Sequence, residues 1–180
     1  NGGQTFSEVT SAGRFGHIQK GHGVSFADFD QDGDQDVYAV LGGAFEWDLF
    51  QNVYFDNPIN DNNWIVIELK GNRTNTSAIG TKICVRLEGG RQIFATVNTG
   101  GSFGSNSLQA ELGIGGAERI ESIEVFWQNS PNQIIRNVLP NNKYRITEGS
   151  NEAEKRNYKA IDFFKDSGPE HIDHMHRKSK

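Results

Sequence analysis

Seven short segments between residues 64 and 148 alternate between apolar and polar side chains. The clearest is WIVIELK at 64–70, in which every second residue is a branched aliphatic one, and the segments at 81–87 and 119–127 repeat the pattern. A period of two places alternate side chains on opposite faces of a β-strand. The other four segments lie at 92–97, 107–113, 133–138 and 143–148, with turns of Gly, Asn and Ser between them.

Seven short strands of this kind favour a sandwich or a small barrel, and we expect an antiparallel β-sandwich over residues 62–149. The residues predicted to face inward are Ile65, Ile67, Leu69, Ile83, Val85, Leu87, Ile123 and Val125. The single cysteine, Cys84, excludes an intrachain disulfide and is expected to be a small strand residue.

The composition supports an all-β chain and excludes two classes of function. The 180 residues are 35% hydrophobic and include 21 glycines, and strong helix formers are sparse before residue 150. The net charge is −5, with no basic stretch outside the last few residues, so we expect no nucleic acid partner. No apolar run is long enough to predict a transmembrane segment.

The stretch DFDQDGDQD at 28–36 places five aspartates at every second position. Like charges at this spacing repel one another, and a bound cation would turn that repulsion into attraction. Calcium prefers six to eight oxygen ligands, and a loop with carboxylates at its odd positions and a glycine at position 6 supplies them. The expected calcium ligands are the side chains of Asp28, Asp30, Asp32 and Asp36 and the backbone carbonyl of Asp34.

The flanks of this acidic loop are strand-like: GVSFA enters it and VYAVL leaves it. An EF-hand would have a bidentate Glu at position 12 of the loop, where this chain has Ala39. The sequence therefore predicts a strand–loop–strand calcium site. Magnesium fits less well, because it demands a stricter octahedron and keeps its waters. A solvated acidic turn without a metal is the alternative.

The chain divides into three parts: residues 1–61 with the acidic loop, the sandwich at 62–149, and a charged segment at 150–180. In the last part, Ser150 is a good helix N-cap, and Tyr158, Ile161 and Phe164 would form one narrow apolar stripe. We therefore expect one short C-terminal helix followed by a polar tail. That tail contains His171, His174 and His176, which leaves open whether it binds a borderline metal.

Two parts of the chain resemble known families. The segment GHGVSFADFDQDGDQDVYAV resembles the calcium-binding blade motif of FG-GAP/VCBS repeat β-propellers, and NGGQTFSEVT resembles the strand that precedes it. Residues 62–149 resemble the ASPIC/UnbV domain that follows such repeats in cartilage-acidic-protein-like secreted proteins. The matching pieces are NNWIVIELKG, SAIGTKICV, GGSFGSNSLQAELGIG, IESIEVFW and NVLPNNKYRITEG. The chain departs from the family at WQNSPNQ (127–133), where Trp-Pro-Ser-Gly is usual.

This resemblance implies an extracellular or cell-surface, calcium-stabilised protein without catalytic activity. It assigns the metal to Asp28, Asp30, Asp32, Asp34 and Asp36. It also implies that residues 1–61 form a partial propeller blade with a calcium loop. Because a propeller needs about four or more blades to close, we expect the chain to be the C-terminal part of a longer one.

Three functions remain open on the sequence. The first is a secreted calcium-binding module for adhesion or recognition of glycan or protein ligands. The second is a structural terminal segment of a larger propeller or extracellular assembly. The third is an accessory part of an enzyme acting on extracellular polymers, which would need paired carboxylates in a cleft.

We expect any ligand surface on the loops at 71–79 and 99–106 or on the aromatic segment 42–55, because loops on a rigid β scaffold commonly carry recognition. Aromatic side chains stack on sugars and peptides, but packing between the blade and the sandwich is the alternative role. The aromatic residues of this segment are Phe45, Trp47, Phe50, Tyr54 and Phe55.

Overall fold

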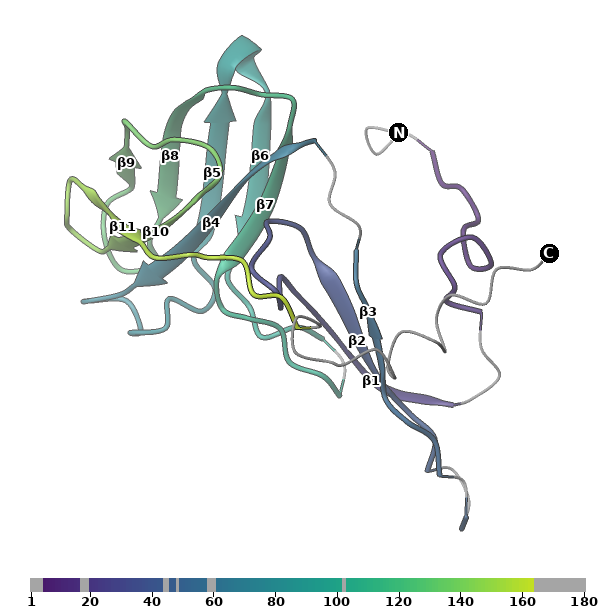
Figure 1. Cartoon of the computed structure of the whole chain (residues 1–180). Coiled ribbons are helices and arrows are strands. Elements are labelled where there is room, and N and C mark those ends of the chain that lie inside the picture. The colour runs from purple at the N-terminus through teal and green to yellow at the C-terminus, as the bar shows by residue number, and fades with distance from the viewer. Residues whose placement is uncertain are drawn as a thin grey trace.

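The computed structural model describes residues 5–16, 20–43, 46–47, 49–57, 61–101 and 103–163. In this part of the chain the regular structure is β-strand, apart from one 3-10 turn, η1 (Glu88–Gly90). The strands form three sheets, one of three strands and two of four (Figure 1). Within the same residues, no helix has the length and apolar character that a membrane span requires.

The three-stranded sheet comes first along the chain and is antiparallel. It contains β1 (Gly21–Ala27), β2 (Asp36–Leu41) and β3 (Val53–Phe55) in that order. The acidic loop is the connection between β1 and β2, as the strand–loop–strand prediction required.

The strand expected before this motif is wrong for its described residues. Residues 5–10 are not in a strand, and the chain instead closes a turn in which the Phe15 N–H donates to the Thr10 carbonyl at 2.9 Å. On the outer edge of β1, the Phe26 N–H instead donates to Asn106 Oδ1 at 3.1 Å.

The two four-stranded sheets pack face to face as a β-sandwich. One sheet has the order β11-β10-β4-β7 and the other β6-β5-β8-β9. The bounds are β4 (Asn63–Lys70), β5 (Lys82–Leu87), β6 (Gln92–Thr96), β7 (Ala110–Gly115), β8 (Ile120–Phe126), β9 (Gln133–Ile135), β10 (Asn142–Thr147) and β11 (Ala153–Arg156). The turn η1 joins β5 to β6, and Gly89 and Gly90 have φ of 73° and 82° there, which glycine adopts without strain.

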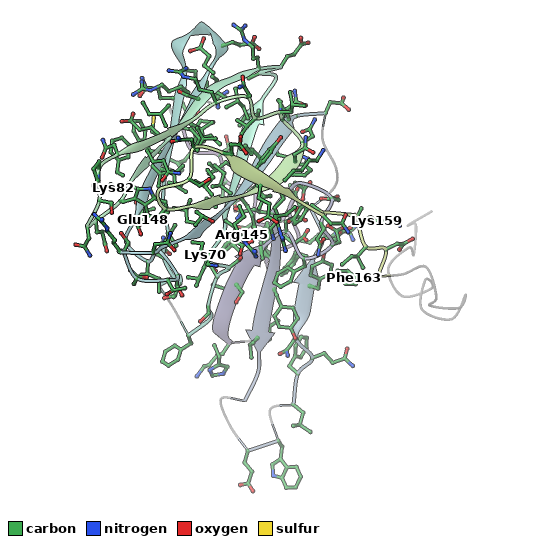
Figure 2. All side chains as sticks on the ribbon, turned by 90° about the vertical axis from the view of Figure 1, so that its left-hand side faces the viewer. Lys70, Lys82, Arg145, Glu148, Lys159 and Phe163 are labelled. Atoms are coloured by element: carbon green, nitrogen blue, oxygen red, sulfur yellow. The ribbon has the colours of Figure 1, made fainter. Side chains whose placement is uncertain are left out.

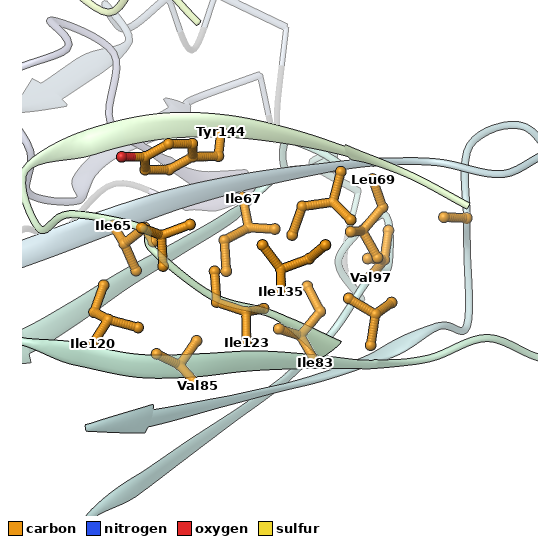
Figure 3. Close-up of a cluster of buried hydrophobic side chains, with 14 of the residues drawn as sticks. Ile65, Ile67, Leu69, Ile83, Val85, Val97, Ile120, Ile123, Ile135 and Tyr144 are labelled. Atoms are coloured by element: carbon orange, nitrogen blue, oxygen red, sulfur yellow. The ribbon is translucent and has the colours of Figure 1, made fainter. Parts of the chain in front are cut away.

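The core lies between these two sheets, and the sequence predicted it correctly. Figure 3 shows Ile65, Ile67 and Leu69 of β4 facing side chains of the opposite sheet. All eight residues expected to face inward are buried, the most exposed being Leu69 at 6%. Cys84 is also buried in its strand, and its thiol donates to Gln92 Oε1 at 3.6 Å.

The sandwich is not wholly antiparallel, which corrects the predicted topology. Strand β10 pairs with β4 in parallel, while the other edge of β4 pairs antiparallel with β7. Parallel neighbours require a long crossover, and here the crossover is the whole of β5 to β9. The pairing sets Arg145 opposite Glu68, and the two side chains form an ion pair at 2.8 Å.

The predicted C-terminal helix is wrong for the described residues. The chain instead forms β11, which pairs antiparallel with β10. Ser150 Oγ accepts the Glu152 N–H at 3.2 Å, as an N-cap does, but it closes a turn that leads into this strand. The free edge of β10 supplies a hydrogen-bonded partner that outweighs local helix propensity. Residues 164–180, with the three tail histidines, lie outside the described part.

Candidate metal centre

The first and last aspartates of the acidic loop are brought together by the β1–β2 ladder. Ala27 pairs with Asp36 at the end of that ladder, so Asp28 begins the loop directly beside the residue that ends it. Both carboxylate residues are buried, Asp28 at 6% and Asp36 at 1% exposed. Asp30 joins them, and one oxygen from each of these three carboxylates lies within 4.8 Å of the others.

Backbone N–H groups hold the loop in a tight turn around Asp28. Its Oδ1 accepts the Asp32 N–H at 3.0 Å, and its Oδ2 accepts the Gly33 N–H at 2.9 Å. Gly33 has φ of 110°, and a side chain there would overlap the Trp64 indole. A glycine is therefore required both by the backbone conformation and by the contact with β4.

Asp32 and Asp34 lie outside the group of three carboxylates in the described residues. Asp32 Oδ1 accepts the Asp34 N–H at 3.1 Å. The two carboxylate oxygens of Asp34 are shielded from solvent and have no hydrogen-bond partner among the described residues. We predicted a backbone carbonyl role for Asp34, whereas the structure buries its carboxylate as well. A buried polar group without a partner is unfavourable unless something satisfies it.

The loop concentrates negative charge that burial makes unfavourable. Burial, together with repulsion from Asp32, raises the pKa of Asp30 to about 6. The same two causes raise the pKa of Asp34 to about 7. Burial also raises the pKa of Asp28, although hydrogen bonds from Tyr158 and the loop oppose that shift. Because the oxygens that come together here belong to carboxylates, the donor set fits a hard divalent cation with oxygen ligands.

Groups outside the loop orient the outermost carboxylates. The Tyr54 hydroxyl donates to Asp36 Oδ2 at 2.9 Å, and the Asn57 N–H donates to Asp36 Oδ1 at 3.0 Å. The Tyr158 hydroxyl donates to Asp28 Oδ2 at 2.9 Å. Partners of this kind fix the orientation of metal ligands and tune their affinity.

The sandwich holds the loop through a residue that the sequence did not identify. Glu111 of β7 accepts the Asp28 N–H at 3.0 Å and the Gln35 amide at 3.1 Å. The alternation in β7 indicates only that Glu111 points away from the core, so no local signal reveals this contact. Beside it, a polar cleft of about 550 Å³ lies between the loop and the sandwich, with Asp34, Trp64 and Glu111 among its lining residues.

The aromatic segment divides into a packed part and an exposed part. Phe55 packs on Phe15 with ring centroids 4.8 Å apart, and Tyr54 packs edge-on against Phe29 at 6.0 Å. Trp47, in contrast, is 87% exposed, so packing between sheet and sandwich does not account for it. Three residues later in the sequence, Phe50 lines an apolar hollow of about 1270 Å³. Phe45 lies outside the described residues.

The structure thus defines a β-sandwich with a three-stranded sheet that carries an acidic hairpin loop. A comparison with family models finds one match, ASPIC and UnbV, over residues 71–153. This stretch begins after β4 and ends at the start of β11, and it supports the ASPIC/UnbV part of the sequence resemblance. The match does not extend to the acidic loop. No curated protein matches the chain.

Proposed function

We propose that the chain is a non-catalytic, calcium-binding module of an extracellular protein, which serves adhesion or recognition of glycan or protein ligands. Its residues 1–61 act as a partial FG-GAP/VCBS-like blade in this proposal. The observation that carries it is the group of three carboxylates, from Asp28, Asp30 and Asp36, within 4.8 Å of one another. The carboxylate of Asp34, which is buried and has no hydrogen-bond partner among the described residues, adds another acidic group that a positive charge would stabilise.

A calcium ion in the loop would stabilise the junction between the two parts of the molecule. The loop contacts the sandwich through the Glu111 carboxylate and through the Gly33–Trp64 packing. A cation that removes repulsion within the loop therefore also favours the arrangement of the sheet on the sandwich. Calcium has a structural role in this account, and the carboxylates are assigned to ligation rather than to acid–base chemistry.

An exposed aromatic surface favours recognition of a ligand. The indole of Trp47 is 87% exposed, and the apolar hollow with Phe50 follows it along the chain. Indole rings combine a large apolar face with a polar edge, which suits both sugar rings and apolar peptide side chains. We place the ligand on this surface.

A second candidate is a structural role as a terminal segment of a larger propeller. The three-stranded sheet favours it, because Phe26 and Val40 are 42% and 41% exposed on strands that have no sheet packed over them in the described residues. Apolar sheet faces are ordinarily covered by another layer. In this role the same loop would bind calcium, and the exposed strands would contact other blades.

Thermal unfolding of the full chain in chelator and in calcium tests the proposal. Extracellular calcium modules bind with Kd of about 0.1–1 mM, so about 1 mM calcium adds about 0.4–1.4 kcal/mol of stability. For a chain of this size, the Tm should rise by about 1–6 °C. Asp30→Asn should remove the rise, whereas Asp61→Asn, an exposed aspartate outside the loop, should keep it. An equal Tm in chelator and in calcium for the unmodified chain would refute calcium binding.

A further inference from the structure

The chain returns to the acidic loop after its last strand. Residues 157–163, which we call the C-terminal strap, leave β11 and reach two residues of the loop. The Tyr158 hydroxyl donates to Asp28 Oδ2 at 2.9 Å, and the Ile161 N–H donates to the Asp30 carbonyl at 2.6 Å. The strap therefore contacts two of the three residues whose carboxylates come together.

The strap is also held by the sandwich and by the three-stranded sheet. The Tyr158 ring packs on Trp64 of β4 at 5.6 Å, and the Lys143 ammonium lies 5.3 Å from its centroid. Phe163 packs edge-on against Tyr54 at 6.0 Å. Figure 2 shows Lys159 and Phe163 where the sandwich meets the three-stranded sheet.

The hydrogen bonds of Asp28 determine which oxygen is available to a cation. Its Oδ2 already accepts two donors, the Gly33 N–H and the Tyr158 hydroxyl, whereas Oδ1 accepts only the Asp32 N–H in the described residues. Each carboxylate oxygen has about two lone-pair sites. The phenol therefore fills Oδ2, while one lone-pair site of Oδ1 has no donor among the described residues.

Much of the strap is exposed to solvent. Ile161 and Phe163 are 43% and 51% exposed, and no strand pairs with residues 157–163. Segments with few buried contacts open at low free energy. The position of the strap therefore depends on a few contacts, two of which are made to the loop at Asp28 and at the Asp30 carbonyl.

We propose that Tyr158 is a positioning residue for the metal ligand Asp28 and that docking of the C-terminal strap is coupled to calcium in the loop. This inference rests on the proposed calcium binding and adds a regulated element to it. Coupling of two sites is reciprocal. Calcium should hold the strap in place, and a docked strap should increase the affinity for calcium.

Calcium titration calorimetry of the full chain tests the positioning role. Tyr158→Phe keeps the ring and removes the hydroxyl, and it should raise the calcium Kd about 10-fold, as loss of an outer-shell partner does. Tyr38→Phe is the matched control, because it removes a phenol that accepts from Asn52 rather than one that donates to a loop carboxylate. It should change the Kd less than about 2-fold. Urea unfolding in chelator verifies that both variants keep the sandwich intact.

Limited proteolysis of the same proteins tests the coupling with a separate readout. A lysine-specific protease that does not itself need calcium should cleave after Lys159 about 10-fold more slowly in saturating calcium than in chelator, following the open fraction of the strap. Magnesium at the same concentration should protect less, and Tyr158→Phe should lose most of the protection.

The outcomes separate this inference from the proposed function. Calcium binding by the unmodified chain with an unchanged Kd in Tyr158→Phe and equal cleavage after Lys159 in calcium and chelator would overturn the coupling alone. An absence of calcium binding to the unmodified chain would overturn the proposed function and this inference together.

Discussion

Glu148 anchors one end of the sandwich, and its replacement should destabilise the fold strongly. This residue follows β10 and is 5% exposed, and Figure 2 shows it across the sandwich from Lys159. Its Oε2 accepts the backbone N–H groups of Asn72, Arg73 and Thr74 at 2.6, 2.8 and 2.9 Å. One carboxylate therefore fixes the loop that follows β4. The variant Glu148→Gln keeps the shape of this side chain and removes its negative charge.

The expected loss of stability follows from the three N–H groups that donate to Glu148. Hydrogen bonds to a charged acceptor contribute about 1.5–3 kcal/mol each, against about 0.5–1.5 kcal/mol for neutral pairs. The three donors share one oxygen, so their contributions do not add in full. Loss of the charge should therefore lower the free energy of unfolding by about 2–3 kcal/mol. Glu148→Ala removes the acceptor altogether. In this variant, water can hydrogen-bond to the N–H groups of the exposed Asn72 and Arg73 but not to that of the buried Thr74. We therefore expect the free energy of unfolding to fall by about 3–4 kcal/mol.

The effect of Glu148 should depend on pH. Burial alone would raise the pKa of Glu148, but hydrogen bonds from Ser130 and from the three backbone N–H groups outweigh it and lower the pKa from 4.5 to about 2. A carboxylate with a depressed pKa in the folded state stabilises above its unfolded value and loses this contribution as the pH falls through its folded value. The difference in the free energy of unfolding between the unmodified chain and Glu148→Gln should therefore have its full size at pH 7 and decrease as the pH falls from about 4.5 to 2.

Urea unfolding at pH 7 and pH 3, in chelator throughout, measures both effects. Glu121→Gln is the control, since Glu121 is exposed on β8 and undergoes the same change of charge; it should stay within about 0.5 kcal/mol of the unmodified chain. A Glu148→Gln variant as stable as that control at pH 7 would refute the anchoring role. A stability difference that persists undiminished at pH 3 would refute its electrostatic origin.

Two further predictions concern the acidic loop and the exposed aromatic surface. Gly33→Ala should destabilise the loop by about 2–4 kcal/mol, because of the positive φ at Gly33 and the overlap of the added carbon with Trp64. It should also shift the tryptophan fluorescence. Gly116→Ala is the control, since the carbon added there meets nothing within 4 Å, and it should change neither the stability nor the fluorescence. Trp47→Ala should remove binding on glycan and protein ligand arrays and leave the Tm within about 1–2 °C, because the side chain is 87% exposed. Ligand binding that survives Trp47→Ala would move the recognition surface elsewhere.

The alternating segments were sufficient to predict the sandwich core, because burial on one face of a strand leaves a local pattern. The eight inward residues, among them Ile67 and Ile123, could be identified without any knowledge of which strands pair. Strand order leaves no such pattern. The parallel pairing of β10 with β4 joins residues 77 positions apart, such as Glu68 and Arg145, and β11 occupies the other edge of β10.

For the candidate site, the sequence likewise predicted the local part, the acidic loop, and not the distant residues that contact it. The spacing of the aspartates and Gly33 pointed to the loop, because all five aspartates lie within nine residues. The partners that orient it come from distant elements: Glu111 from β7 and Tyr158 from the strap. Tyr158 was assigned to the apolar stripe of a helix, since a tyrosine near Ile161 gives no sign that its hydroxyl contacts a carboxylate.

A crystal structure of the full chain grown in calcium would show whether the acidic loop binds the ion. We predict one calcium ion in the β1–β2 loop, with oxygens of Asp28, Asp30 and Asp36 at about 2.3–2.6 Å and further ligands from Asp32 and Asp34. An anomalous difference map would identify the ion. If the loop held no ion in saturating calcium, with Asp28, Asp30 and Asp36 still grouped together, the loop would not be a calcium site.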